Sequence, residues 1–252
     1  MRTTPMHGAI RFAAVLLALP AALTAQDLAQ RVTTSRDGQF RLSFAARPGV
    51  CGNGANSISI VDDDDEWEGG CERGPVRLSL RVTNGVVSDA HTYVGGRWRQ
   101  ATSTVTDLGT LPAGKTANDL LVLAERATDG EALITAATLA DSTVIWPRLI
   151  ALAHRTTVPI ETRKHAVFWL GQAAGVAATR GLDSIAGDDT GEIEVRKQAV
   201  FALSQRPEIE GVPVLIHIAR SNPNGELRKS AIFWLGQSED PRALALFEEL
   251  LR

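Results

Sequence analysis

The chain has 252 residues, of which 44% are hydrophobic and 22% are charged, and its formal net charge at pH 7 is −3. This mild acidity argues against a nucleic-acid-binding protein, which usually presents a clustered basic face to the phosphate backbone. A chain of this length can form one or two domains.

The first 25 residues have the layout of a secretory signal peptide. Arg2 and Arg11 supply positive charge, residues 12–20 (FAAVLLALP) form a short apolar run, and residues 23–25 (LTA) end in a small side chain. This layout predicts cleavage after Ala25, and the apolar run is shorter than the ~20 residues that a membrane-spanning helix needs. We therefore expect a periplasmic or secreted protein without a membrane span. Its remaining 24 basic and 29 acidic residues would give a net charge of −5.

The two cysteines of the chain, Cys51 and Cys71, both follow the predicted cleavage site. In an exported protein the oxidising compartment favours a disulfide between them. The loop that this bond would close is long enough to stabilise the fold by roughly 3 kcal/mol, according to the chain-entropy relation.

Residues 26–112 are typical of a small β-rich domain. A short helix is expected at 27–35, and Asn84-Gly85 between two alternating segments predicts a hairpin, because both turn positions need positive φ. Alternation of apolar and polar residues predicts strands at 40–44 (FRLSF), 57–61 (SISIV), 76–82 (VRLSLRV) and 86–94 (VVSDAHTYV).

After Pro112 the periodicity becomes helical, and the chain repeats itself. Segments at 116–127, 131–140 and 143–155 have helical apolar spacing. Three related decapeptides follow, each with a second helical stretch behind it: RKHAVFWLGQ (163–172), RKQAVFALSQ (196–205) and RKSAIFWLGQ (228–237). Helix pairs repeated every 32 or 33 residues predict an α-solenoid over residues 113–252, with repeats near 159–190, 192–222 and 224–252. The expected fold class is therefore α+β.

The decapeptide helix carries two stripes of side chains. The Arg, Ala and Leu positions, with Val or Ile, form a stripe that should be buried. Lys, Phe and Gln form a second stripe, which predicts Phe168, Phe201 and Phe233 stacked from repeat to repeat beside a ladder of glutamines. A glutamate three residues before each lysine predicts an i,i+3 ion pair within each helix.

The last unit, residues 227–252, resembles bacterial HEAT repeats of the phycobilisome-lyase-like type. The residues that match this pattern are Leu227, Arg228, Ala231, Leu235, Gly236, Asp240, Pro241 and Arg242. Asp240 and Pro241 suit the N-cap and first position of a helix. The resemblance implies a protein-binding scaffold most often, and a chromophore lyase in a minority of cases. Residues 26–112 resemble no family that we identify.

The expected function is that of a non-enzymatic scaffold or adaptor whose solenoid binds a protein or peptide. Trp169 and Trp234 occupy the same repeat position, with the small Ala202 between them. They either pack in the core or flank a groove above Ala202, where Trp is favoured as an interface anchor. The candidate protein-binding residues are Lys164, Trp169, Lys197, Lys229 and Trp234. The alternative is a ligand-transfer protein or enzyme similar to chromophore lyases.

Other motifs point to no catalytic, cofactor or metal site. GTLPAGKT (109–116) fits the P-loop expression, but helical repeats rather than βαβ units follow it, so we interpret it as a linker. DDDDEWE (62–68) has Trp67 where an EF-hand loop needs glycine, so we interpret it as a solvated loop tip rather than a calcium site. The histidines after residue 25 lack metal-ligand spacing.

Overall fold

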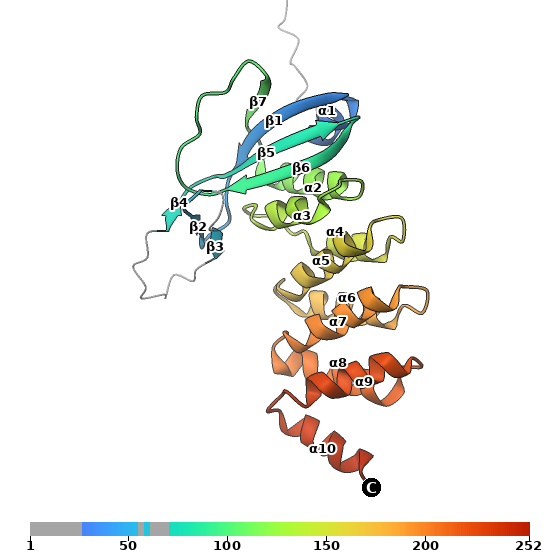
Figure 1. Cartoon of the computed structure of the whole chain (residues 1–252). Coiled ribbons are helices and arrows are strands. Elements are labelled where there is room, and N and C mark those ends of the chain that lie inside the picture. Colours follow the sequence, from blue (N-terminus) through green and yellow to red (C-terminus); the bar gives the residue numbers. More distant parts are fainter. Residues whose placement is uncertain (1–26, 55–57, 61–70) are drawn as a thin grey trace, which may run out of the picture.

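The computed structural model describes residues 27–54, 58–60 and 71–252. A β-rich part precedes a helical part, so the predicted α+β architecture is confirmed (Figure 1). The predicted signal peptide and the acidic run at 62–68 lie outside the described residues. The strands are β1 (Asp37–Phe44), β2 (Val50–Gly52), β3 (Ile58–Ile60), β4 (Glu72–Arg73), β5 (Val76–Thr83), β6 (Val86–Tyr93) and β7 (Val105–Thr110).

The main sheet has the strand order β6-β5-β1-β7, and a smaller sheet has the order β3-β2-β4. Neighbouring strands are antiparallel except β7, which runs parallel to β1 at the edge. The predicted hairpin is confirmed: β5 and β6 are joined at Asn84 and Gly85, whose φ angles are 52° and 76°. The segment that forms β7 is only weakly apolar and is not among the predicted strands. It pairs nevertheless, because an edge strand buries little of itself.

The main sheet has one buried face and one open face. Phe40, Leu42 and Phe44 alternate along β1 with polar residues, and β5 alternates in the same way. Because successive side chains of a strand point to opposite faces, the apolar set gathers on one side. Helices α1, α2 and α3, which all contact β6, cover that side. The open face carries Arg41 and Arg77.

The helices of the described chain begin with a short one before the sheet, as expected, and continue without strands after β7. They are α1 (Leu28–Thr34), α2 (Ala113–Ala124), α3 (Gly130–Thr138), α4 (Trp146–His154), α5 (Ile160–Gly171), α6 (Val176–Gly187), α7 (Ile193–Ser204), α8 (Glu208–Ser221), α9 (Gly225–Leu235) and α10 (Pro241–Leu250).

A buried carboxylate ties α1 to α2. The Leu28 N–H donates to Asp119 Oδ2 at 3.1 Å, and Lys115 Nζ lies 3.2 Å from the same oxygen. Lys115 Nζ also lies 3.1 Å from Asp27 Oδ1. Burial, together with the hydrogen bond to Asp27, raises the pKa of Asp119 to about 6.

These contacts give a structural role to Lys115, which is the lysine of the P-loop-like motif at residues 109–116. Lys115 is held by two carboxylates, and only two residues separate β7 from α2. A phosphate-binding loop needs a longer turn whose backbone N–H groups converge on the anion. Residues 109–116 therefore form a strand-to-helix connection.

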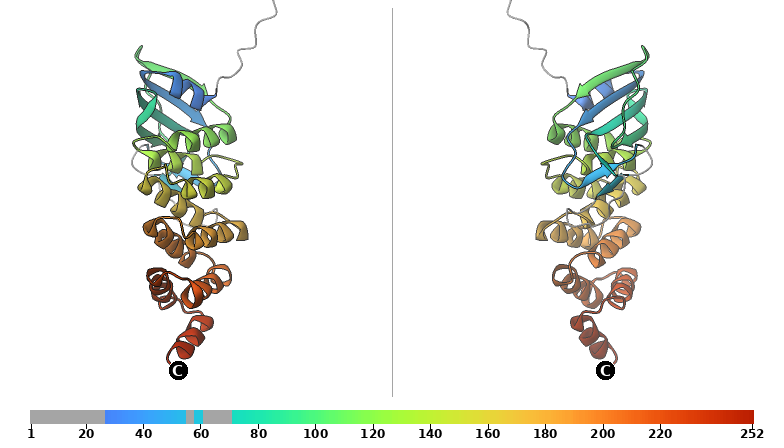
Figure 2. Two further views of the ribbon diagram at one scale, coloured as in Figure 1. Left: turned by 90° about the vertical axis from the view of Figure 1, so that its right-hand side faces the viewer. Right: turned by 90° about the vertical axis from the view of Figure 1, so that its left-hand side faces the viewer.

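From α3 onward the helices stack as pairs in two layers that lead away from the sheet (Figure 2). Helices α3, α5, α7 and α9 contact one another in turn, and α4, α6, α8 and α10 form the second layer. The three decapeptides lie in the C-terminal parts of α5, α7 and α9 and end just after them. As predicted, their Ala and Leu positions are buried: Ala166, Leu170, Ala199, Leu203, Ala231 and Leu235.

The hydrophobic core is continuous from the sheet into the helix pairs. Leu80 of the sheet, Leu120 of α2 and Leu170 of α5 belong to one cluster of buried residues. The loop after β1 also joins the helical part directly, because the Arg47 N–H donates to the Leu139 carbonyl at 2.9 Å. This contact brings Arg47 beside the first helices of the stack.

The predicted disulfide is confirmed. Cys51 of β2 and Cys71, which precedes β4, have bonded sulfurs 2.04 Å apart and Cα atoms 5.3 Å apart. A disulfide is in keeping with an oxidising compartment. No helix within the described ranges is both long and apolar enough to cross a bilayer. In the same ranges no three His, Cys, Asp or Glu side chains gather as metal ligands.

Candidate functional site

The arginine of each decapeptide holds the loop in front of its helix. Arg163 and Arg196 are buried, and their Nε atoms donate to the carbonyls of Val158 at 3.1 Å and Ala186 at 3.0 Å. Arg228 donates through Nη1 to the Asn222 carbonyl, which follows α8, at 2.7 Å. Ala186 and Asn222 lie at the ends of α6 and α8, where backbone carbonyls have no partner within the helix, so Arg196 and Arg228 satisfy them. The Val158 carbonyl lies in the loop directly before α5. The arginines therefore position the helices and leave partner contacts to the outer stripe.

The lysines of the outer stripe lie on the exposed side of the α5, α7 and α9 layer. Lys164 pairs with Glu161 at 3.0 Å and Lys229 with Glu226 at 3.1 Å, both within one helix as predicted. The pair predicted within α7 is replaced by a contact between helices, since Lys197 Nζ lies 3.7 Å from Glu226. Exposed pairs of this kind contribute about 0–1 kcal/mol, so a partner can readily replace them.

The aromatic side chains of the same layer are arranged differently from the predicted stack of phenylalanines. Trp234 lies between two phenylalanine rings, with centroid distances of 4.9 Å to Phe201 and 5.0 Å to Phe233. Phe168 packs edge-on against Trp169 at 5.5 Å within its own helix. Phe168 remains 38% exposed and Phe233 58% exposed. The larger tryptophan rings reach into the gaps between helices and take the contacts that the phenylalanines were expected to share.

Trp169 is oriented by a histidine one turn earlier. Its indole Nε1–H donates to His165 Nε2 at 3.0 Å, and the Thr135 hydroxyl lies 2.9 Å from the same nitrogen. Burial lowers the pKa of His165, which favours the neutral ring that such an acceptor nitrogen requires. The histidine thus fixes the ring that faces the first pocket.

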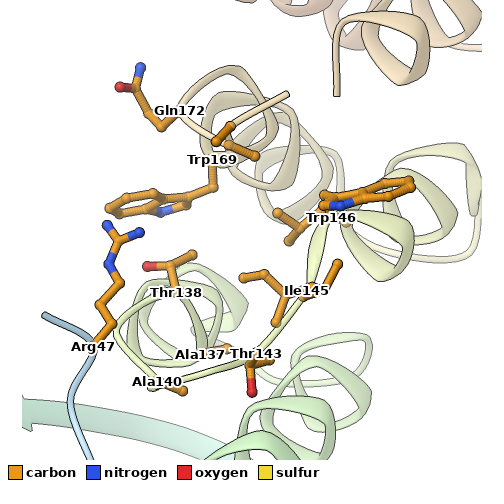
Figure 3. A pocket seen from close by; sticks show the side chains of 13 residues that line it. Arg47, Ala137, Thr138, Ala140, Thr143, Ile145, Trp146, Trp169 and Gln172 are labelled. Atoms are coloured by element: carbon orange, nitrogen blue, oxygen red, sulfur yellow. The ribbon is translucent and has the colours of Figure 1, made fainter. Parts of the chain in front are cut away.

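The first pocket, called here the Trp169 pocket, lies where the β-rich part meets the stack, and has a volume of about 260 Å³. Figure 3 shows Arg47 reaching from the loop after β1 toward the Trp169 indole, with Thr138 and Ile145 lining the space below. Arg47 Nε is buried there without a hydrogen-bond partner among the described residues. Thr143 Oγ1 is also unpaired, but it points away from the Arg47 and Trp169 side chains, toward Gly114 of α2 (Figure 3). Arg47 can donate, so the pocket suits a ligand group that offers an acceptor beside an aromatic wall.

The second pocket, called here the Trp234 pocket, lies at the corresponding step between α7 and α9. Its volume is about 350 Å³, and Gln205 and Gln237 line it with Trp234. At the intermediate step Ala202 is 2% exposed, and a Cβ added to Gly171 would lie 3.0 Å from it. The helices are therefore in close contact there. The two tryptophans line separate pockets rather than one groove above Ala202.

Sequence reasoning missed Arg206, which has the largest polar network of the described residues near these pockets. Its guanidinium donates to the carbonyls of Gly171 and Gly175 at 3.1 Å each, to Thr179 Oγ1 at 3.0 Å, and to Glu210 at 2.8 Å. Arg206 Nη1 also donates to the Ala173 carbonyl. Arg206 lies outside the decapeptide, and its repeat counterparts are not arginine, so no periodic signal marks it.

Comparison with known proteins agrees with this architecture. A family model for HEAT repeats matches residues 188–252, which contain α7 to α10 and the Trp234 pocket. No curated protein sequence matches the chain. Residues 188–252 therefore match HEAT repeats, and the helix pairs with their layered stacking agree with that match.

Proposed function

We propose that this chain is an exported, non-enzymatic scaffold or adaptor, and that the α3, α5, α7 and α9 layer binds a protein or peptide. The observation that carries the proposal is the aromatic row on this layer, where Phe168 and Phe233 are exposed beside the half-buried Trp169 and Trp234. Grouped apolar side chains at a soluble surface mark interaction sites. HEAT repeats, which the family model matches in this part of the chain, commonly mediate such interactions.

The geometry suits an extended segment that spans several repeats. Tryptophan rings in pockets are the anchors that dominate interface energies, and surrounding polar groups set orientation. Arg47 Nε supplies an unpaired donor in the Trp169 pocket. Lys164, Lys197 and Lys229 lie on the same layer and favour a partner with acidic residues. Neither a nucleic-acid partner nor a membrane span is part of this proposal.

Export is the second element of the proposal. The leader-like residues 1–25 and the Cys51–Cys71 disulfide both support a periplasmic or extracellular location. The β-rich part would then cover the first helices of the stack and place Arg47 at the Trp169 pocket.

The test is capture of partners from the envelope extract of the source cell by the mature chain, measured by mass spectrometry and then by titration. The Trp169→Ala/Trp234→Ala variant should weaken binding of a stoichiometric protein partner by about tenfold or more, as expected for interface anchors. Trp98→Ala, which removes a tryptophan from the β-rich part, is the matched control and should leave binding unchanged.

The tryptophans also pack against the core, so a milder variant separates binding from folding. Phe168→Ser/Phe233→Ser changes exposed rings and should reduce capture while leaving the unfolding transition near that of the wild type. If both double variants bind the partner as the wild type does, this layer is not the interface.

The second candidate is a ligand-transfer protein or enzyme similar to chromophore lyases. The unpaired Arg47 Nε of the Trp169 pocket favours it, because a small molecule with an acceptor could occupy that space. A small molecule that copurifies with the chain, in the absence of a protein partner, would support this candidate over the scaffold.

A further inference from the structure

We propose that the open face of the main sheet carries a second binding site, separate from the solenoid, for a small organic anion with an aromatic body. The site is called here the arginine pocket. It lies between the solvent side of β1, β5 and β6 and the loop at 95–102, and has a volume of about 480 Å³. That volume is within the range of small-molecule sites, which run from roughly 300 to 1,000 Å³.

The pocket is built by two arginines of the sheet that hold the covering loop. Arg77 Nη1 donates to the carbonyls of Gly95 and Gly96, at 2.7 Å each. Arg41 Nη1 donates to the Arg99 carbonyl at 2.7 Å. Gly95 has a φ of +72°, and a Cβ there would lie 2.3 Å from the carbonyl oxygen of Gly52 in β2, so the loop can pass the smaller sheet this closely only with glycine at this position.

The aromatic wall consists of Trp98 and Tyr93. Their ring centroids are 5.6 Å apart with an interplanar angle of 53°, and the Arg41 guanidinium lies 5.2 Å from the centroid of the Trp98 ring. Trp98 is therefore held between a cation and a second ring in a fixed orientation. A planar ligand can extend this arrangement by stacking on the remaining aromatic surface.

The lining of the pocket is basic although the chain as a whole is acidic. Arg41, Arg77, Arg97 and Arg99 line it. The nearby acids are already bound within the protein, because Asp107 pairs with Arg41 at 2.5 Å and Glu72 accepts from the Gly96 N–H at 2.8 Å.

Two of these arginines supply the charge for a ligand. Arg97 and Arg99 are exposed at the rim, and their guanidinium groups pair with no side chain of the described part of the chain. A guanidinium is planar and binds a carboxylate or sulfonate through two parallel hydrogen bonds. Arg41 and Arg77 thus form the pocket, while Arg97 and Arg99 select an anion beside the rings of Trp98 and Tyr93.

The test is titration of the full chain with 2-naphthoate, followed by calorimetry and by tryptophan fluorescence. We expect saturable binding that weakens with salt, because the rim charges are exposed. The uncharged 2-naphthamide should bind at least tenfold more weakly. Arg97→Gln/Arg99→Gln should weaken naphthoate binding tenfold or more, and Trp98→Ala should do likewise.

Arg81→Gln is the matched control, since Arg81 lies on the same open face but outside the pocket, next to Asp89. It should leave the affinity unchanged. The proposal is overturned if the wild type does not bind naphthoate at millimolar concentration, if the amide binds equally well, or if the Arg97/Arg99 and Trp98 variants bind as the wild type does. None of these results depends on the solenoid, so the scaffold proposal is tested separately.

Discussion

Replacing Arg206 with alanine should lower the free energy of unfolding by about 3–5 kcal/mol, the usual cost of removing one partner from a buried charged network. Arg206 is 8% exposed and contacts the loop at 171–175 as well as Glu210. Its loss would leave three backbone carbonyls without their donor in a place from which the surrounding helices still exclude water. It would also leave Glu210, whose side chain is 19% exposed, without its cation. The measurement is chemical denaturation followed by circular dichroism.

Arg220→Ala is the matched control for this variant. Arg220 also pairs with a glutamate, Glu249, but the two side chains are 49% and 57% exposed. An exposed pair is worth about 0–1 kcal/mol, so this variant should remain close to the wild type. Arg206→Lys should rescue little, because an ammonium group cannot reproduce the fork that reaches several carbonyls. A stability of Arg206→Ala within about 1 kcal/mol of the control would refute the structural role.

Replacing Asp119 with asparagine should change the pH dependence of stability rather than lower stability at every pH. The pKa of Asp119 is about 6 in the folded protein, against an ordinary value of 3.8. A raised carboxyl pKa means that its contribution to stability is fully present below the unfolded pKa and is lost as the pH rises through the folded pKa. Relative to strongly acidic solution, the raised pKa of Asp119 therefore lowers the free energy of unfolding by about 1 kcal/mol near pH 4.5 and by about 3 kcal/mol near pH 7.5.

Asparagine does not ionise, and its side-chain oxygen can still accept from the Leu28 N–H. The stability of Asp119→Asn relative to the wild type should therefore improve by about 2 kcal/mol between pH 4.5 and 7.5. Asp188→Asn provides the opposite sign, because hydrogen bonds from Thr190 and His154 lower the pKa of Asp188 to about 2. Its loss should cost most above pH 4 and least in acid. Parallel pH profiles for Asp119→Asn and the wild type would contradict the prediction.

Much of the architecture follows from periodicity along the sequence. Local geometry determines the alternation in β1 and β5, the Asn84-Gly85 turn and the 32- to 33-residue repeat. These features can therefore be predicted without knowledge of the tertiary structure. The disulfide was equally accessible, since the chain has only Cys51 and Cys71. The strand β7 is harder to predict from the sequence, because an edge strand needs little apolar character.

The details of the candidate sites were less accessible. The equivalence of Trp169 and Trp234 is visible in the repeat, but the pockets they line depend on side chains from other segments. Arg47 reaches the Trp169 pocket from a loop more than a hundred residues earlier in the chain. The arginine pocket combines three strands with a loop that has no regular pattern.

The sequence by itself determined strands β1, β3, β5 and β6, the succession of helix pairs, the disulfide and the buried stripe of each repeat, because each depends on residues near one another in the chain or on a unique pairing. Only the tertiary structure decided which carboxylate is buried, which arginines hold loops and which remain free, and where cavities remain. Those properties depend on desolvation and on contacts across long sequence separations, as between Leu28 and Asp119 or between Arg206 and Gly171.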